Sequence, residues 1–220
     1  MPDNPIDYGW EKAIWDKLVP FYGGNEFAAA GTMGNWYTES YLVPFQMEKD
    51  SPAGSISSDY TSKVDAGTIG KATFINGYYN GKGPGYGLAQ WTYSTRKQRM
   101  YDFWNTSEFR GGGVSIGSVN FEIAWFEKEM VTWFPNTYAG MKAQTNVDSA
   151  SDYFLRNFEG IWNSSYINRR AQSRYYYEKY TGTTPDPGPD PDPDPPAPPD
   201  PPIPEEKKKF KWIYYMRRKY

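Results

Sequence analysis

The segment 185–204 limits how much of this chain can fold. It contains twelve prolines, many of them alternating with aspartate, and no basic residue. Proline has no amide hydrogen, so this segment cannot form the hydrogen-bond ladder of a helix or sheet. In polyproline geometry its length would reach roughly 60 Å, at about 3.1 Å per residue. The sequence therefore predicts a folded domain over 1–184, an extended linker over 185–204 and a separate tail over 205–220.

The composition excludes several classes of function. Among 220 residues there is no histidine and no cysteine, which removes the imidazole base and thiol nucleophile of peptidases and the usual ligands of zinc. No metal or organic cofactor is expected, because a phosphate-binding loop is also missing. The formal net charge of -2 argues against a nucleic-acid partner. Catalysis, if any, falls to carboxylates. Residues 1–7 do not resemble a signal peptide.

Apolar residues at helical spacing predict a mainly helical domain. Besides a helix that ends near Pro20 and one that begins after Asn25, helices are expected over 94–107, 118–133, 147–158 and 167–180. From Pro44 to Pro84 this pattern is missing, and short β-prone pieces occur at 72–75 and 77–79. This region is expected to be a small β wing. The expected fold class is therefore α+β, mainly α.

The helix that begins after Asn25 has a face of small residues. Asn25 can cap it, and Ala28, Ala29, Ala30, Gly31 and Gly34 follow. A glycine in a helix interior costs about 1 kcal/mol relative to alanine, so the two glycines indicate that another backbone packs closely against this face. The helix is expected to be buried.

Glu39 lies near the C-terminal end of the same expected helix, next to Trp36 and Tyr37. Cleavage of a sugar linkage requires a general acid that still holds its proton near neutral pH. Desolvation beside the aromatic rings and the negative end of the helix dipole would both favour the protonated form. Glu39 is therefore the candidate acid.

Two motifs occur in this order, Gly34-Asn35-Trp36-Tyr37-Thr38-Glu39-Ser40 and Gly85-Tyr86-Gly87-Leu88-Ala89-Gln90-Trp91-Thr92. They resemble the paired motifs of the phage tail lysozyme family, within the lysozyme and lytic transglycosylase superfamily. The resemblance extends to Arg96, the helix 121–130, the segment 157–159 and the segment 169–180, so it covers roughly residues 7–180. It implies a lysozyme-like fold and cleavage of the β-1,4 glycan of bacterial peptidoglycan, with Glu39 as the acid.

The second motif supplies candidates for substrate binding. Gln90 matches a glutamine that lies in the substrate cleft of related transglycosylases, and the resemblance implies that it binds substrate. Alternatively, its amide holds the glycine turn together. Tyr78, Tyr86 and Trp91 are candidates for stacking on sugar faces, and the alternative for each is a core or hairpin aromatic.

Hydrolysis normally requires a second carboxylate near the acid. Asp50, Asp59 and Asp65 lie in the expected wing, where lysozymes commonly place it, and each is alternatively a turn residue. Asp59 is preferred because it precedes Tyr60 in a possible strand. Without such a partner, Glu39 would act alone in a lytic transglycosylase that uses the sugar's own 6-hydroxyl as the nucleophile.

The tail 205–220 combines seven Lys or Arg residues with aromatic side chains. It suits attachment to an anionic membrane surface or to teichoic acid. The alternatives are an appendage without a target and a strand that docks on the folded domain.

The expected function is that of a muramidase in phage-type lysis or wall penetration, acting from a virion tail or from the host cell. A glucosaminidase or lytic transglycosylase acting on the same polymer is the alternative. From another class, the alternative is a noncatalytic tail-tip protein that grips peptidoglycan.

Overall fold

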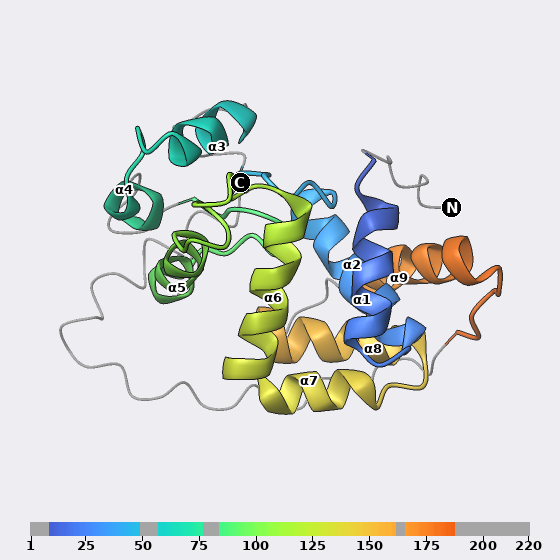
Figure 1. Cartoon of the computed structure of the whole chain (residues 1–220). Coiled ribbons are helices and arrows are strands. Elements are labelled where there is room, and N and C mark those ends of the chain that lie inside the picture. The colour runs from blue at the N-terminus through green and yellow to red at the C-terminus, as the bar shows by residue number, and fades with distance from the viewer. Residues whose placement is uncertain (1–8, 49–56, 77–83, 162–165, 188–220) are drawn as a thin grey trace, which may run out of the picture. The chain divides into compact units, whose positions relative to one another are not determined.

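The structure, a computed structural model, describes residues 9–48, 57–76, 84–161 and 166–187 (Figure 1). The described residues belong to one unit of the chain, Met1–Gly188. Its elements are α1 (Glu11–Phe21), α2 (Glu26–Ser40), α3 (Ser57–Asp65), α4 (Lys71–Asn76), α5 (Ser94–Trp104), α6 (Val119–Trp133), α7 (Pro135–Lys142), α8 (Val147–Phe154), the π-helix η1 (Leu155–Glu159) and α9 (Tyr166–Thr181). The prediction of a mainly helical domain is confirmed.

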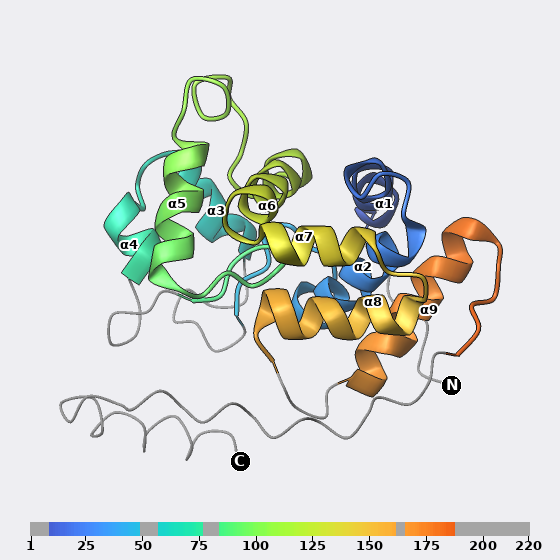
Figure 2. The same ribbon diagram turned by 90° about the horizontal axis from the view of Figure 1, so that it is seen from below.

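The helices form two groups, seen in Figures 1 and 2. α3, α4 and α5 lie on one side and α1, α2 and α9 on the other, with α6 and α7 between them. α2 packs against α1, α8 and α9, and residues 28–36 of α2 are buried. As predicted, Asn25 caps α2, because its side chain accepts a hydrogen bond from the amide of Ala28 at 3.0 Å. α2 is thus the central helix of its group.

The two glycines of α2 mark its closest contacts with other helices. A Cβ at Gly31 would lie 2.8 Å from the backbone carbonyl carbon of Ala150 in α8. A Cβ at Gly34 would lie 2.5 Å from the backbone nitrogen of Ser173 in α9. Neither distance is compatible with a side chain in a closely packed interior. The prediction of a close backbone neighbour is confirmed, with a different helix at each glycine.

The predicted β wing is wrong for the residues that the structure describes. Residues 57–65 form α3, and residues 71–76, which include the β-prone piece 72–75, form α4. Within the described ranges, β pairing is limited to isolated bridges of Tyr86 with Met47 and with Trp91. Helix formation buries Tyr60 and Val64, which are four residues apart, and this tertiary burial outweighs weak local β propensity. The piece 77–79 lies outside the described residues.

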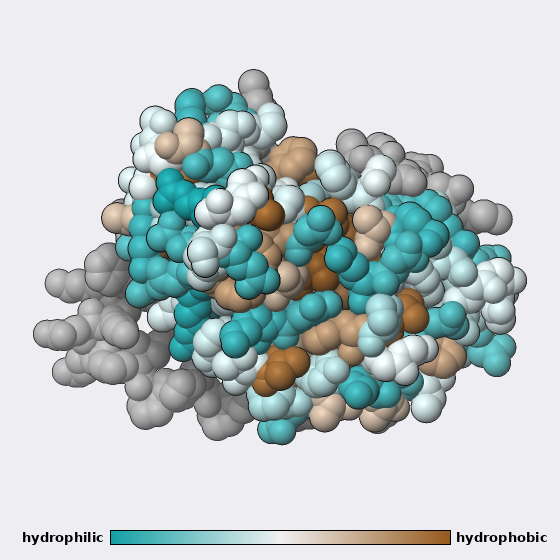
Figure 3. All heavy atoms as spheres, viewed as in Figure 1, coloured by the Kyte–Doolittle hydropathy of each residue, from teal (hydrophilic) through white to brown (hydrophobic). Residues whose placement is uncertain are grey.

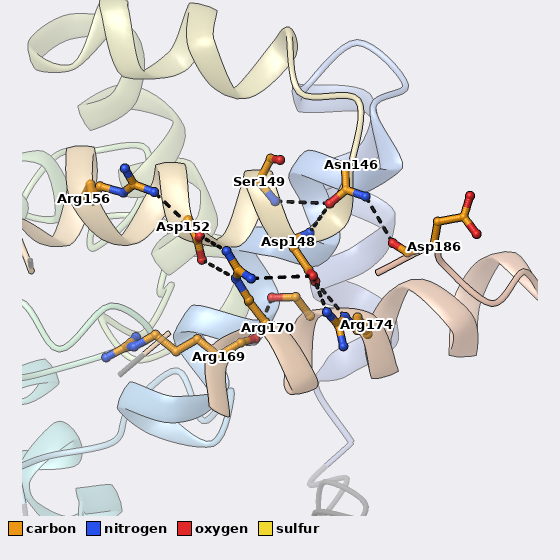
Figure 4. Close-up of polar contacts among 10 residues, drawn as sticks. Asn146, Asp148, Ser149, Asp152, Arg156, Arg169, Arg170, Arg174 and Asp186 are labelled. Atoms are coloured by element: carbon orange, nitrogen blue, oxygen red, sulfur yellow. Dashed lines mark hydrogen bonds and ion pairs between the residues drawn. The ribbon is translucent and has the colours of Figure 1, made fainter. Parts of the chain in front are cut away.

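Ion pairs join α8 to α9 (Figure 4). Arg170 donates from Nε to Asp152 at 2.9 Å and Arg174 donates from Nε to Asp148 at 2.7 Å, and both aspartates are buried. Figure 4 shows that Arg169 of the same helix points away from these pairs. The ion pairs therefore help to fix the position of α9, which carries Arg169.

The face seen in Figure 3 is mostly hydrophilic, with hydrophobic residues gathered in the middle of the view, around α6 and α1. In the described ranges, each helix is too short or too polar to cross a membrane. Most of the predicted linker 185–204 and the whole tail 205–220 lie outside these ranges, so the three-part division of the chain stays a prediction.

Candidate active site

The two sequence motifs meet where α2 ends. The hydroxyl of Ser40 lies 3.0 Å from the carbonyl oxygen of Trp36 and 2.9 Å from that of Leu88, as a hydrogen-bond donor. The helix stops here because Tyr41 and Leu42 adopt left-handed backbone conformations, with φ of 55° and 58°. The hydrogen bond from Ser40 to Leu88 holds the glycine-rich segment next to Glu39.

Glu39 forms an ion pair with Arg169 of α9. The side chain of Glu39 is 23% exposed and that of Arg169 is 5% exposed. Arg169 also donates from Nη1 to the backbone oxygen of Asn35 at 3.1 Å and to its Oδ1 at 3.2 Å. The first motif therefore provides both the carboxylate and the residue that orients its cation. The sequence predicted a desolvated acid among aromatic rings, whereas the structure has a partly exposed carboxylate with a cationic partner.

Asn35 is itself held firmly. Its side-chain amide donates to the backbone oxygens of Gly31 at 2.8 Å and Ser151 at 3.0 Å. The close approach of α8 at Gly31 makes the second bond possible. The small-residue face of α2 and the position of Arg169 are thus parts of one arrangement.

Glu159 is a second carboxyl group near this ion pair, and it was not among the predicted site residues. It is the last residue of the π-helix η1, and Gly160 follows with a φ of 70°. Within the described residues its Oε1 is buried and has no hydrogen-bond partner. Burial, and secondly the negative charge of Glu39, raise the pKa of Glu159 to about 8, while Arg96 and Arg169 oppose this shift. π-Helices occur frequently at functional sites.

Arg96 is bound to a different carboxylate. It donates from Nε to Oε1 of Glu129 at 2.6 Å and from Nη2 to Oε2 at 2.7 Å, and its guanidinium carbon lies 4.5 Å from the centre of the Phe158 ring. The indole of Trp91 donates to the same Glu129 at 2.8 Å. Trp91 is 1% exposed, so its ring has no free face for a sugar, and we assign it to the core.

Tyr86 is also a core residue in this structure. It is fully buried, and its hydroxyl lies 2.7 Å from the hydroxyl of Thr61. Its ring packs edge-on against Phe74 with centroids 5.3 Å apart. The predicted stacking of Tyr86 on a sugar finds no support in this position. Tyr78 lies outside the described residues.

Gln90 holds the glycine-rich turn together. Its side-chain amide donates to the carbonyl oxygens of Gln46 and Gly87, each at 3.0 Å, and its φ of 47° is left-handed. Two roles were predicted for Gln90, substrate binding and support of the turn. These contacts favour support of the turn. Gly87 has a φ of 79°, and a Cβ there would collide with the carboxylate of Glu122. Only glycine suits this position.

Glu122 is a buried acid behind the turn. Its Oε2 accepts a hydrogen bond from the amide of Leu88 at 3.1 Å, and burial raises its pKa well above the usual range. A neutral carboxyl group at this place avoids an uncompensated charge in the core. Glu122 therefore belongs to the support of the second motif.

The aspartates of the predicted wing that the structure describes make structural contacts. Asp59 lies on α3 with its side chain 59% exposed, and it pairs with Lys63 one turn away at 2.6 Å. Asp65 accepts a hydrogen bond from the amide of Ile116 at 2.9 Å. The predicted role of Asp59 as the partner of Glu39 finds no support in these contacts. Asp50 lies outside the described residues. Across the described ranges, acidic side chains do not gather in threes around a possible metal site.

Comparison with known proteins identifies a family. A family model described as phage tail lysozyme matches residues 9–180. The matched range contains Glu39, Glu159 and Arg169. No curated protein and no solved structure matches the chain.

Proposed function

The chain belongs to the phage tail lysozyme family, and we propose that it cleaves the β-1,4 glycan of bacterial peptidoglycan as a muramidase, with Glu39 as the general acid. Membership of this family implies a peptidoglycan glycosidase that acts on the bacterial cell wall. The finer assignment, of the bond cleaved and of the residue that donates the proton, is our proposal.

The observation that carries the proposal is the ion pair of Glu39 with Arg169, which Asn35 of the same motif holds in place. A general acid must reach its substrate, and the side chain of Glu39 is partly exposed. When Glu39 donates its proton, the bond to the leaving oxygen breaks and a carboxylate remains. The guanidinium of Arg169 would stabilise that carboxylate.

A lytic transglycosylase is the second candidate reaction. It is favoured by the placement of Asp59, which pairs with Lys63 and is largely exposed. Without a wing carboxylate to act as nucleophile or base, the sugar's own 6-hydroxyl would attack and an anhydro product would be released. A glucosaminidase would cut the same polymer at the other linkage, and a noncatalytic wall-binding protein would cut neither.

Mass spectrometry of fragments released from purified peptidoglycan distinguishes these candidates. Reducing N-acetylmuramic ends are expected, whereas reducing N-acetylglucosamine ends would indicate a glucosaminidase and anhydro ends a transglycosylase. Glu39→Gln should release no fragments but still bind the wall. Glu26→Gln, at the exposed first turn of the same helix, is the matched control and should behave as wild type. Cleavage by Glu39→Gln at the wild-type rate would contradict the assignment.

We also propose that the tail 205–220 attaches the enzyme to an anionic wall polymer or membrane surface. Tethering a catalytic domain to its polymer raises the effective substrate concentration. Replacing Lys207, Lys208 and Lys209 with glutamate in the full chain should reduce co-sedimentation with walls that contain teichoic acid. Unchanged co-sedimentation at low and at high salt would reject this role.

A further inference from the structure

We propose that Glu159 is the second carboxyl group of this active site, and that it shares one proton and one counter-ion, Arg169, with Glu39. Glu159 is a positioning residue in this scheme, because it acts through Glu39 and not on the sugar. The inference rests on the proposed function of Glu39, but the sharing of the proton can be measured independently of that function.

The balance of charges gives the first argument. Glu159 lies within electrostatic reach of Glu39 on α2, Arg96 on α5, Glu129 on α6 and Arg169 on α9. Arg96 is bound at both nitrogens by Glu129, and Arg169 is bound by Glu39. Each of the two cations is therefore paired with another carboxylate, and Glu159 has no cation of its own. Glu159 is partly exposed, but its Oε1 is buried. A charge on this carboxyl group without a counter-ion would be costly, so the neutral form is favoured.

The cation on Glu159's own helix is also engaged. Arg156 lies 3.6 Å from Asp152 of α8 and 5.6 Å from the centre of the Tyr166 ring. Like that of Arg169, its Nε is a buried donor without an acceptor among the described residues, but Arg156 is not one of the charges that move the pKa of Glu159.

Of the two cations that oppose the rise in the pKa of Glu159, Arg96 has the larger effect, but Glu129 binds it through Nε and Nη2. Arg169 has a buried Nε without an acceptor among the described residues, so Arg169 is the cation that Glu159 shares.

Unpartnered atoms give the second argument. Among the described residues, Oε1 of Glu159 is a buried acceptor without a hydrogen-bond donor, and Nε of Arg169 is a buried donor without an acceptor. Leaving such atoms unpaired costs about 1–3 kcal/mol each. A movement of the Arg169 side chain that paired its Nε with Oε1 of Glu159 would recover this free energy. The site therefore has a second arrangement available, in which Arg169 pairs with Glu159.

The two arrangements contain the same number of protons. In the structure, Arg169 pairs with the Glu39 carboxylate and Glu159 is protonated. In the alternative, Arg169 pairs with the Glu159 carboxylate and Glu39 holds the proton, which it exchanges through solvent at its exposed edge. The second arrangement is the one that can protonate a leaving group. Glu159 thus explains how a glutamate that is paired with an arginine can act as an acid.

The proton balance closes over one turnover. Glu39 gives its proton to the glycosidic oxygen, which leaves with the electron pair of the broken bond. Arg169 then returns to the Glu39 carboxylate. The nucleophile is water or the sugar's 6-hydroxyl, and it loses a proton as its oxygen bonds to the anomeric carbon. That proton returns to the two glutamates, so the scheme serves hydrolysis and transglycosylation alike.

The test is a pH titration followed by NMR, with glutamate labelled with carbon-13 at the side-chain carboxyl. The wild type should show a carboxyl resonance that titrates near pH 8 and disappears in Glu159→Gln. In Glu39→Gln this titration should move down by about 1 pH unit or more, because a like charge is lost and Arg169 is released. Glu127→Gln removes another carboxyl whose pKa burial raises, and it should leave the resonance unchanged. An unchanged titration of Glu159 in Glu39→Gln would overturn the proposal.

The pH dependence of cleavage supplies the second readout. In Glu159→Gln the alkaline limb of kcat/KM should move to lower pH, and the rate at neutral pH should fall about tenfold or more. Glu159→Asp should restore part of the lost rate at neutral pH. An unmoved limb in a folded Glu159→Gln would contradict the role of Glu159. If the wild type cleaves no glycan, the proposed function fails, but the titration still decides whether the two glutamates share a proton.

Discussion

Substituting Gly34 with alanine tests whether the contact between α2 and α9 positions the site. The new Cβ would meet Ser173 at its hydroxyl and, at 2.5 Å, at its backbone nitrogen, and it would lie 2.8 Å from the carbonyl oxygen of Arg169. The hydroxyl could rotate, but the two backbone atoms can yield only if α9 moves. Because α9 carries Arg169, such a movement would weaken its pairing with Glu39.

The expected magnitude follows from two opposing contributions. Adding a methyl group to a filled core costs about 1–3 kcal/mol, and contact with backbone atoms places Gly34→Ala at the upper end, about 3 kcal/mol. Replacing glycine with alanine within a helix returns about 1 kcal/mol. The net loss is about 2 kcal/mol, which lowers Tm by about 4–8 °C in a domain of this size.

Thermal unfolding followed by circular dichroism, with wall lysis measured on the same samples, is the assay for Gly34→Ala. Gly70→Ala is the control, because a Cβ there meets nothing within 4 Å, and it should change Tm by less than about 2 °C. If Gly34→Ala were as stable as wild type or more stable, helix propensity would have prevailed. The argument that the glycine is needed for close packing would then be refuted.

Other substitutions test the support of the site. Burial lowers the pKa of Lys97 from 10.5 to about 7, so the folded state binds fewer protons than the unfolded state between these values. The free energy of unfolding should therefore rise with pH over this window, and urea titrations of Lys97→Met should lack that rise. Arg170→Met leaves buried Asp152 without its closest cation and should cost about 3–5 kcal/mol in urea unfolding, whereas Lys12→Met, in an exposed pair, should cost less than about 1 kcal/mol. Gln90→Ala removes two hydrogen bonds of the glycine-rich turn and should lower stability by about 1–2 kcal/mol, measured in the same way; an unaltered midpoint would argue against a structural role.

Glu159 also affects the pH dependence of stability, with the opposite sign. Its pKa is raised by folding, so it contributes stability at low pH that is lost as the pH rises through about 8. The rise in stability due to Lys97 covers about pH 7 to 10.5, so it overlaps the loss due to Glu159 only between about pH 7 and 8. Comparison of Lys97→Met with Glu159→Gln therefore separates the two groups by the pH range in which each variant departs from wild type.

Local patterns in the sequence determined the helical class, the cap at Asn25 and the burial of α2. They also singled out Glu39, through its motif and its position at the end of that helix. These features depend on residues within about one helical turn of one another, and such interactions can be read from spacing and side-chain type. The small residues Gly31 and Gly34 even showed that a neighbouring backbone would lie there, although not which helix would supply it.

Tertiary packing alone decided the remainder. Residues 57–65 became helical because this conformation buries Tyr60 and Val64 against the core. Tyr86 and Trp91 became core residues for the same reason, although their motif had suggested contact with sugar. The cation that pairs with Glu39 comes from α9, 130 residues along the chain. Its place beside Glu39 depends on how α2, α8 and α9 pack, and short-range sequence patterns carry no information about such distant pairs.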